Sequence, residues 1–148
     1  MTLQYLRRGA AALAAAGLLT TCLAGCGSSS TSPSNVVPFG QLDVRLGTGT
    51  DAVAGKALTV NYTGWLYDAS KTDAKGIQFE TSVGATPFTF TLGANQVIQG
   101  WERGIPGMKI GGVRRLVIPS SLAYGASRNG PIPPYASLVF EIELLDVQ

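Results

Sequence analysis

The side chains of this protein that could take part in chemistry are aromatic rather than acid–base. Trp101, one of two tryptophans, lies in QVIQGWERGIPGMKIGG (residues 96–112), which has the pattern of a short amphipathic helix bracketed by glycines. The 148 residues include no histidine, the commonest general base and metal ligand. Cys22 and Cys26 are the only cysteines, and both lie near the N-terminus. The segment around Trp101 therefore offers no nucleophile, no histidine and no obvious metal ligand.

The elements that must position Trp101 are short strands. Alternating apolar and polar residues predict strands, and only residues 96–105 have apolar side chains at helical spacing. The longest alternating segment, 56–67, places Leu58, Val60, Tyr62 and Leu66 on one face. The predicted strands are residues 41–46, 56–67, 87–93, 111–119 and 136–148, and the predicted loops are 68–76 and 120–134. We therefore expect an α+β fold, an antiparallel sheet of about five strands folded over one short helix.

Composition and charge exclude several classes of protein. Apolar residues make up 45% and charged residues 14%, which fits one strand-rich globular domain. The formal net charge is +2, but without Arg7 and Arg8 of the N-terminal segment nine basic and nine acidic residues remain. A nucleic-acid-binding protein would normally carry a basic footprint, so we expect no nucleic-acid partner. Arg114 and Arg115 are interpreted as flanking a solvated strand face.

The first residues have the pattern of a bacterial export signal. Two arginines precede an Ala- and Leu-rich stretch that is short for a membrane span, which needs roughly 20 apolar residues. The stretch ends in LAGC (residues 23–26), which resembles the lipobox of bacterial lipoproteins and predicts lipidation of Cys26. Cys22 fits less well because Thr20 and Thr21 precede it. A non-lipidated secretory signal or an uncleaved anchor are the alternatives.

These patterns divide the chain into three parts. Residues 1–25 are predicted to be the signal peptide, and residues 26–39 a lipidated N-terminus with a flexible Ser-, Pro- and Gly-rich linker. Residues 40–148 form the predicted domain. Gly27 follows the lipobox cysteine where some bacteria use Asp to retain a lipoprotein in the inner membrane. We therefore expect a cell-envelope protein anchored to a membrane by lipid, and in a Gram-negative host the outer membrane facing the periplasm.

Several segments of the predicted domain together resemble one enzyme family. The segments are VNYTGWL, GIQFETS, PFTFTLGANQVIQGWERGIPGMKIGG, LVIPSSLAYGAS and IPPYASLVFEIELLDV. In this order they are similar to the motifs of FKBP-type peptidyl-prolyl cis–trans isomerases over roughly residues 40–147. The resemblance implies a five- or six-stranded antiparallel sheet wrapped around a short helix, which agrees with the pattern of strands. The implied activity is acceleration of rotation about X–Pro peptide bonds.

The resemblance also assigns roles to individual residues. The implied catalytic positions are Tyr62, Glu80, Tyr124 and Phe140. The implied substrate-binding positions are Phe79, Phe88, Gln96, Val97, Ile98, Trp101 and Ile132, with Trp101 as the floor of the pocket. The implied partners are unfolded or loop X–Pro segments and FK506- or rapamycin-type macrolides. No cofactor or metal is implied, and we expect a monomer.

The implied reaction explains why no histidine is needed. Rotation about a peptide bond breaks its resonance, with a barrier of about 18–20 kcal/mol, but breaks no covalent bond and removes no proton. The planar amide is more polar than the twisted one, so an apolar pocket penalises the planar state more. Aromatic walls around the proline ring and a hydrogen bond from Tyr124 would therefore favour the transition state over the ground state.

Four departures from the family pattern leave alternatives open. The family most often has Asp where this chain has Glu80, which is the feature that favours a proline-peptide-binding, chaperone-like module with little turnover. The segments between Phe79 and Pro87 and between Tyr124 and Pro133 are each one residue shorter than in small family members. A longer loop, Asp68 to Ile77, is the working surface in a third interpretation, in which the domain only presents this loop.

Overall fold

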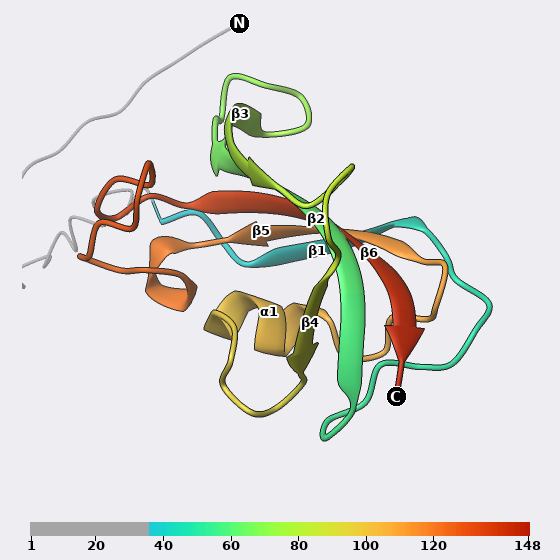
Figure 1. Cartoon of the computed structure of the whole chain (residues 1–148). Coiled ribbons are helices and arrows are strands. Elements are labelled where there is room, and N and C mark those ends of the chain that lie inside the picture. The colour runs from blue at the N-terminus through green and yellow to red at the C-terminus, as the bar shows by residue number, and fades with distance from the viewer. Residues whose placement is uncertain (1–35) are drawn as a thin grey trace, which may run out of the picture. The chain divides into compact units, whose positions relative to one another are not determined.

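The computed structural model describes residues 36–148, which fold as one antiparallel sheet with a short helix (Figure 1). The elements are β1 (Gly40–Arg45), β2 (Ala57–Tyr67), β3 (Lys75–Thr81), β4 (Phe88–Thr91), α1 (Gln99–Gly104), β5 (Val113–Ile118), a 3₁₀ turn (Ser120–Leu122) and β6 (Leu138–Val147). The predicted α+β class is confirmed, and the number of strands is six. The predicted signal peptide and Cys26 lie outside the described residues.

The order of the strands is β1-β5-β6-β2-β3, with β4 also paired to β2. The two longest strands, β2 and β6, pair along nearly their whole length. On the other edge of β2, β4 pairs with residues 57–60 and β3 with residues 63–67, so the two short strands follow one another along the same edge. Side chains from β2, β3, β4 and β6 can therefore meet in front of the middle of β2.

The inner face of the sheet, defined as the face toward α1, holds the core. Leu58 and Val60 of β2 and Ile142 and Leu144 of β6 have no exposed surface. Their alternation with more exposed residues is what a strand with one buried face requires. Full burial of such an apolar side chain stabilises a fold by about 1.5–3 kcal/mol. The core therefore lies where the predicted alternation placed it.

The helix α1 sits close to β5 because two of its residues lack a side chain. A Cβ built on Gly100 would lie 2.4 Å from the Ile118 side chain, and one on Gly104 would lie 2.5 Å from Leu116. Gly100 costs α1 up to about 1 kcal/mol in helix propensity relative to alanine. The close packing of α1 on β5 explains why glycine occupies both positions, and it sets the depth at which Trp101 lies.

Two sequence-based interpretations were wrong or incomplete. Arg114 does not flank a solvated face: it is 7% exposed and ion-paired with Asp43. Its Nη1 also donates to the carbonyls of Gly104 and Pro106, where α1 ends. The alternation rule also missed β3, because this strand has register shifts against β2 and carries the exposed Ile77. Edge strands with bulges lack the regular alternation that the rule needs.

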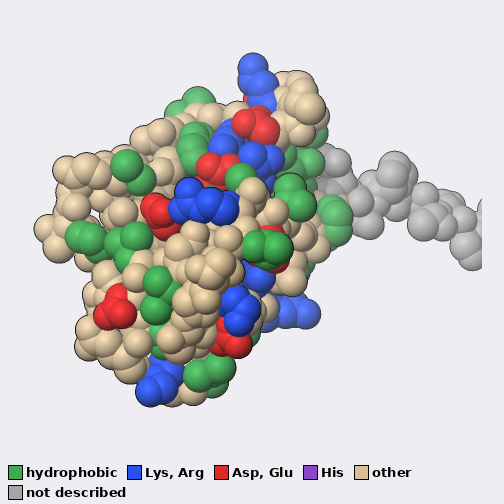
Figure 2. All heavy atoms as spheres, turned by 90° about the vertical axis from the view of Figure 1, so that its right-hand side faces the viewer, with side chains coloured by type: hydrophobic (Ala, Val, Ile, Leu, Met, Phe, Trp, Pro, Cys, Tyr) green, Lys and Arg blue, Asp and Glu red, His purple; other side chains and the backbone are tan. Residues whose placement is uncertain are grey.

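The described surface carries charges of both signs. Figure 2 shows acidic side chains next to basic ones, without a large region of one sign on this face. Ion pairs such as Lys109–Asp51 and Arg45–Glu143 account for part of this mixture. None of the helices within residues 36–148 is long and apolar enough to span a bilayer.

Candidate active site

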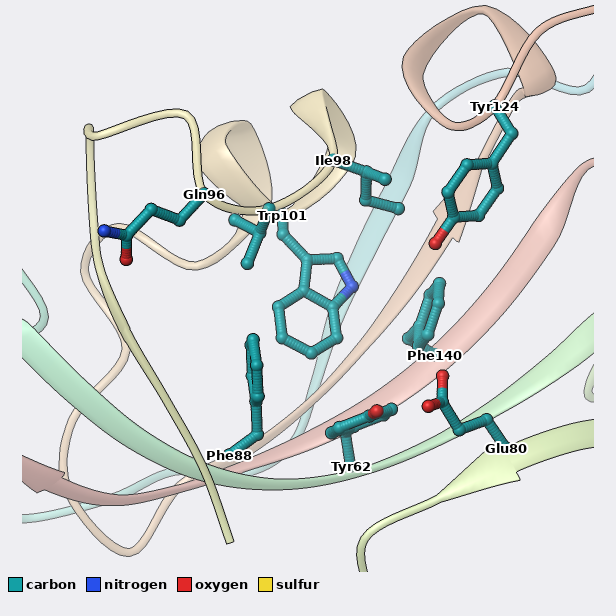
Figure 3. Close-up of a pocket in the computed structure, with 9 residues that line it drawn as sticks. Tyr62, Glu80, Phe88, Gln96, Ile98, Trp101, Tyr124 and Phe140 are labelled. Atoms are coloured by element: carbon teal, nitrogen blue, oxygen red, sulfur yellow. The ribbon is translucent and has the colours of Figure 1, made fainter. Parts of the chain in front are cut away.

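A cavity of about 280 Å³ opens between the inner face of the sheet and the start of α1 (Figure 3). Nine of the eleven predicted catalytic and substrate-binding residues line it: Tyr62, Glu80, Phe88, Gln96, Val97, Ile98, Trp101, Tyr124 and Phe140. They come from β2, β3, β4, the segment before α1, α1 itself, the loop after the 3₁₀ turn, and β6. The fold thus brings together residues that are up to 78 positions apart in the sequence.

Trp101 is the centre of an aromatic cluster in this cavity. Its ring centroid lies 5.2 Å from that of Tyr62 and 5.3 Å from that of Phe140, both in edge-to-face geometry. Phe88 completes the cluster at 6.2 Å. Such pairs contribute about 0.5–1.5 kcal/mol each beyond their burial. The rings hold one another in place before any ligand arrives.

The remaining two predicted residues, Phe79 and Ile132, do not line the cavity. Phe79 lies behind Phe140, with ring centroids 5.7 Å apart in edge-to-face geometry. Ile132 is 4% exposed and packs in the core cluster. A Cβ on Gly64 would lie 2.6 Å from Phe79 and 2.8 Å from Phe140, so glycine at this position makes room for both rings. Phe79 therefore supports the wall that Phe140 presents.

A buried serine that the sequence patterns did not single out fixes the end of β3 to Tyr62. Ser82 is 7% exposed, and its Oγ accepts a hydrogen bond from the Tyr62 amide at 3.0 Å. The Ser82 amide in turn donates to the Tyr62 carbonyl at 2.9 Å. The same hydroxyl lies 3.3 Å from Oδ1 of Asn61, to which it donates. These contacts hold the strand that carries Glu80 against the strand that carries Tyr62.

Glu102 fixes the segment that enters α1. Its two carboxylate oxygens accept hydrogen bonds from the amides of Gly93 at 2.7 Å and Asn95 at 2.9 Å. The Gln96 side chain points away from the cavity in Figure 3, and its Oε1 accepts from the Thr91 amide at 2.8 Å. The Gln96 side chain is therefore tied to β4, and its backbone is the part that we expect a ligand to contact. The sequence patterns did not single out Glu102. Its position directly after Trp101 was the only signal for it.

Two hydrogen-bond donors near the cavity, one from a side chain and one from the backbone, have no partner within residues 36–148. The Trp101 indole Nε1 is buried without a hydrogen bond. The Ile98 amide also donates to no group, while the Ile98 carbonyl accepts from the amides of Trp101 and Glu102. An unmade buried hydrogen bond costs roughly 1–3 kcal/mol. The Ile98 amide, at the cavity wall, is the donor that a bound carbonyl could use.

Both cavity tyrosines are held in the neutral form. Burial, followed by the hydrogen bond to Glu80 and its charge, raises the pKa of Tyr62 to about 12. Burial is also the main reason that the pKa of Tyr124 is raised, aided by the charge of Glu80 and opposed by a hydrogen bond with Asn129. At neutral pH each tyrosine keeps the hydroxyl proton that it could donate.

The cavity suits noncovalent chemistry. It contains aromatic walls, two neutral hydroxyls and one carboxylate, and no histidine or cysteine lines it. The part of the chain that the structure describes has no group of three His, Cys, Asp or Glu residues placed to hold a metal.

Phe90 is a further aromatic residue of the cluster that the sequence patterns did not single out. Its ring centroid lies 5.7 Å from that of Phe88, on which it stacks, and 5.8 Å from that of Trp101, against which it is tilted. Its position two residues after Phe88 in β4 was the signal.

Comparisons with known proteins agree with this site. Residues 49–145 match the family model described as FKBP-type peptidyl-prolyl cis-trans isomerase. An FK506-binding protein of Neisseria meningitidis serogroup B is 49% identical over 106 residues, covering 71% of this chain and 92% of that protein. FK506-binding protein 1B of Neurospora crassa is 39% identical over 103 residues, covering 69% and 91%.

A solved structure shares the fold as well. The crystal structure of AtFKBP13 superposes with a TM-score of 0.64 and 34% identity, covering 74% of this chain and 93% of that one. The family match spans five of the six strands, α1 and all the cavity residues. The chain belongs to the FKBP-type peptidyl-prolyl cis–trans isomerase family, and its activity is isomerisation of the peptide bond before proline.

Proposed function

We propose that the aromatic cavity is the catalytic site and that the substrate's proline ring lies on Trp101. The observation that carries this proposal is the cluster of Tyr62, Phe88, Trp101 and Phe140 around one cavity. Proline is the one residue whose side chain is a compact apolar ring closed onto its own backbone nitrogen, so this lining matches its shape and polarity. Phe88, 39% exposed, stands at the rim.

Catalysis follows from stabilising the twisted amide more than the planar one. The planar X–Pro amide carries more charge on its oxygen and nitrogen, so its transfer from water to aromatic walls costs more than transfer of the twisted form. Only interactions stronger in the transition state accelerate the step, and each 1.36 kcal/mol of difference gives a factor of ten. No proton transfer is required, which fits a cavity whose tyrosines stay neutral.

The polar groups of the cavity then hold the substrate chain. The Tyr124 hydroxyl, directed into the cavity in Figure 3, donates to a backbone carbonyl on the N-terminal side of the rotating X–Pro amide. The unpaired Ile98 amide donates to a carbonyl after proline. Two anchors on opposite sides of the rotating bond fix its ends while the amide between them twists.

The direct test is cis-to-trans isomerisation of an X–Pro tetrapeptide by the full chain, with and without an FK506- or rapamycin-type macrolide. We expect catalysis that the macrolide inhibits, because the relatives are FK506-binding proteins and the cavity holds the macrolide in place of proline. Folded protein that binds the peptide without accelerating isomerisation would instead favour a chaperone-like binding module. Folded protein that neither binds nor isomerises would contradict the proposed site.

We also propose that the enzyme is a monomeric, lipid-anchored isomerase of the bacterial cell envelope. The lipobox pattern at residues 23–26 and the Ser- and Pro-rich segment after it support this proposal. Uncatalysed X–Pro isomerisation takes tens to hundreds of seconds, and a noncovalent isomerase needs no ATP, so it can act on unfolded or loop X–Pro segments outside the inner membrane.

Lipidation is tested by metabolic labelling with an alkyne-modified fatty acid. We expect label on the wild type and on Cys22→Ala, and none on Cys26→Ala, with the labelled protein in the outer-membrane fraction of a Gram-negative host. Light-scattering mass of the detergent-solubilised or unlipidated protein tests the monomer. Label that survives Cys26→Ala would contradict the assigned anchor without bearing on the isomerase.

A further inference from the structure

Glu80 is the one charged residue among the nine that line the cavity. Its carboxylate lies with Tyr124 and Phe140 at one end of the cavity, while Phe88 and Gln96 lie at the other, with Trp101 between them (Figure 3). None of the ion pairs within residues 36–148 involves Glu80. The exposed end of an apolar pocket therefore presents a carboxylate that has no cationic partner within the described residues.

Four of the nine carboxylates within residues 36–148 have a cationic partner, and among the five without one only Glu80 lines the cavity. Asp43, Asp51, Glu141 and Glu143 each pair with a lysine or arginine. The rings around Glu80 add a second attraction for a cation. Tyr62 and Phe140 line the same cavity as Glu80, and Figure 3 shows both rings on the side of its carboxylate. A cation near an aromatic face within about 6 Å of its centroid is attracted by the ring.

The orientation of the substrate places one of its side chains beside Glu80. This step rests on the proposed function, in which proline lies on Trp101 and Tyr124 binds a carbonyl on the N-terminal side of the X–Pro bond. The residue before proline then occupies the end of the cavity that Tyr124 and Glu80 share in Figure 3. Its side chain meets the carboxylate and the ring of Phe140.

We propose that Glu80 makes the enzyme select substrates with lysine or arginine immediately before proline, and disfavour glutamate and aspartate there. Because Glu80 is exposed, the attraction is partly screened by water. We expect lysine to raise kcat/KM about two- to fivefold over an uncharged side chain of the same length, the range of an exposed ion pair. Glutamate should be disfavoured against glutamine by a similar factor, so lysine and glutamate should differ by roughly tenfold.

The test compares tetrapeptides that differ only in the residue before proline. Lysine is matched with Nε-acetyllysine, and glutamate with glutamine, so each pair changes charge at nearly constant size. A leucine peptide serves as the reference substrate. We expect both charge ratios in kcat/KM to approach one at high salt, where the Debye length falls to about 3 Å at 1 M.

Three variants assign the preference to Glu80. Glu80→Gln should bring both ratios close to one whatever its absolute rate, and Glu80→Asp should retain them. Asp146→Asn removes the same charge from a residue that does not line the cavity and should leave both ratios unchanged. If Glu80→Gln turns over too slowly, calorimetric binding of the same peptides gives the ratios.

The outcomes separate this inference from the proposed function. A leucine peptide that is not isomerised by the wild type contradicts the catalytic proposal, and the binding ratios then still decide the role of Glu80. Isomerisation of leucine peptide with charge ratios near one overturns the inference alone. If Glu80→Gln leaves the charge ratios unchanged, the preference belongs to another group. If Asp146→Asn lowers the ratios as much as Glu80→Gln does, the preference arises from the net charge of the protein.

Discussion

The two faces of the sheet are built from the same strands but differ in their polar groups: the inner face encloses an aromatic cavity, and the outer face carries ion pairs. On the inner face, Tyr62 and Phe140 enclose a cavity with Trp101. On the outer face, Glu141, the residue after Phe140, accepts from Lys75 at 2.7 Å and from Arg115 at 2.9 Å. Lys75 also lies 4.4 Å from the centre of the Trp65 ring.

Unpartnered polar groups are concentrated in the cavity on the inner face. On the outer face Lys75 and Arg115 both pair with Glu141. Within residues 36–148, by contrast, the Glu80 carboxylate of the inner cavity has no ion pair, and the Trp101 indole and the Ile98 amide donate to no group. A folded chain tolerates unsatisfied groups mainly where function requires them. The longer β2–β3 segment also has a structural role, because its Lys75 joins the ion pairs of the outer face.

The largest effect is expected from a substitution where α1 packs on the inner face of the sheet. Gly100→Ala should destabilise the protein by about 1–3 kcal/mol, because its Cβ would press against Ile118 and α1 would have to shift. Urea unfolding measures the change. Gln99→Ala, at an exposed position of the same helix, should stay within about 0.5 kcal/mol. A more stable Gly100→Ala, as helix propensity alone predicts, would contradict the close packing.

Removing one hydroxyl should affect catalysis without affecting the fold. Tyr124→Phe should lower kcat/KM about tenfold, the equivalent of about 1.4 kcal/mol for one lost hydrogen bond in the transition state. Tyr135→Phe is the matched control, because Tyr135 lies in the same connection and is 73% exposed. Equal rates for the two variants would remove Tyr124 from the mechanism.

Glu141→Gln should affect stability without affecting catalysis. Burial by itself would raise the pKa of Glu141, but the hydrogen bonds and charges of Lys75 and Arg115 outweigh it and lower the pKa. The stabilisation is therefore present above the unfolded value near 4.5 and is lost as pH falls through the folded pKa. We expect a loss of about 1 kcal/mol at pH 7 that vanishes in acid, with unchanged isomerisation.

The control for this variant is Glu143→Gln on the same face. Its ion pair with Arg45 is more exposed, with 38% and 57% of the two side chains accessible, so the loss should be smaller. Chemical unfolding of both variants at neutral and acid pH compares them. A Glu141→Gln protein whose deficit persists in acid would contradict the pKa argument.

Titration of the inner face should have no effect on catalysis at neutral and mildly alkaline pH. Tyr62 has its folded pKa raised to about 12, so its contribution to stability is complete below the unfolded value of 10 and is lost between 10 and 12. Catalysis should therefore be constant through neutral and mildly alkaline pH. Ultraviolet titration of the wild type and Tyr62→Phe identifies the late-ionising tyrosine. Ionisation of Tyr62 near 10 would contradict the influence of burial and Glu80.

Much of the fold followed from local patterns in the sequence. Alternation placed Leu58, Val60, Ile142 and Leu144 on the buried face, because a strand with one covered face repeats every two residues. It failed for β3, whose bulges and exposed Ile77 interrupt the repeat. It also misplaced Arg114, because the pattern of one strand cannot show that Asp43 and the end of α1 provide partners for a buried guanidinium.

The sequence by itself determined which residue types were available: aromatic rings at fixed motif positions, one carboxylate at Glu80, and no histidine for acid–base chemistry. The tertiary structure was needed to show that nine of the eleven predicted site residues share one cavity, while Phe79 packs against Phe140 and Ile132 lies in the core cluster. The physical reason is that a cavity is formed by elements distant in the chain. Its shape depends on packing distances, such as that between Gly100 and Ile118, that no local pattern records.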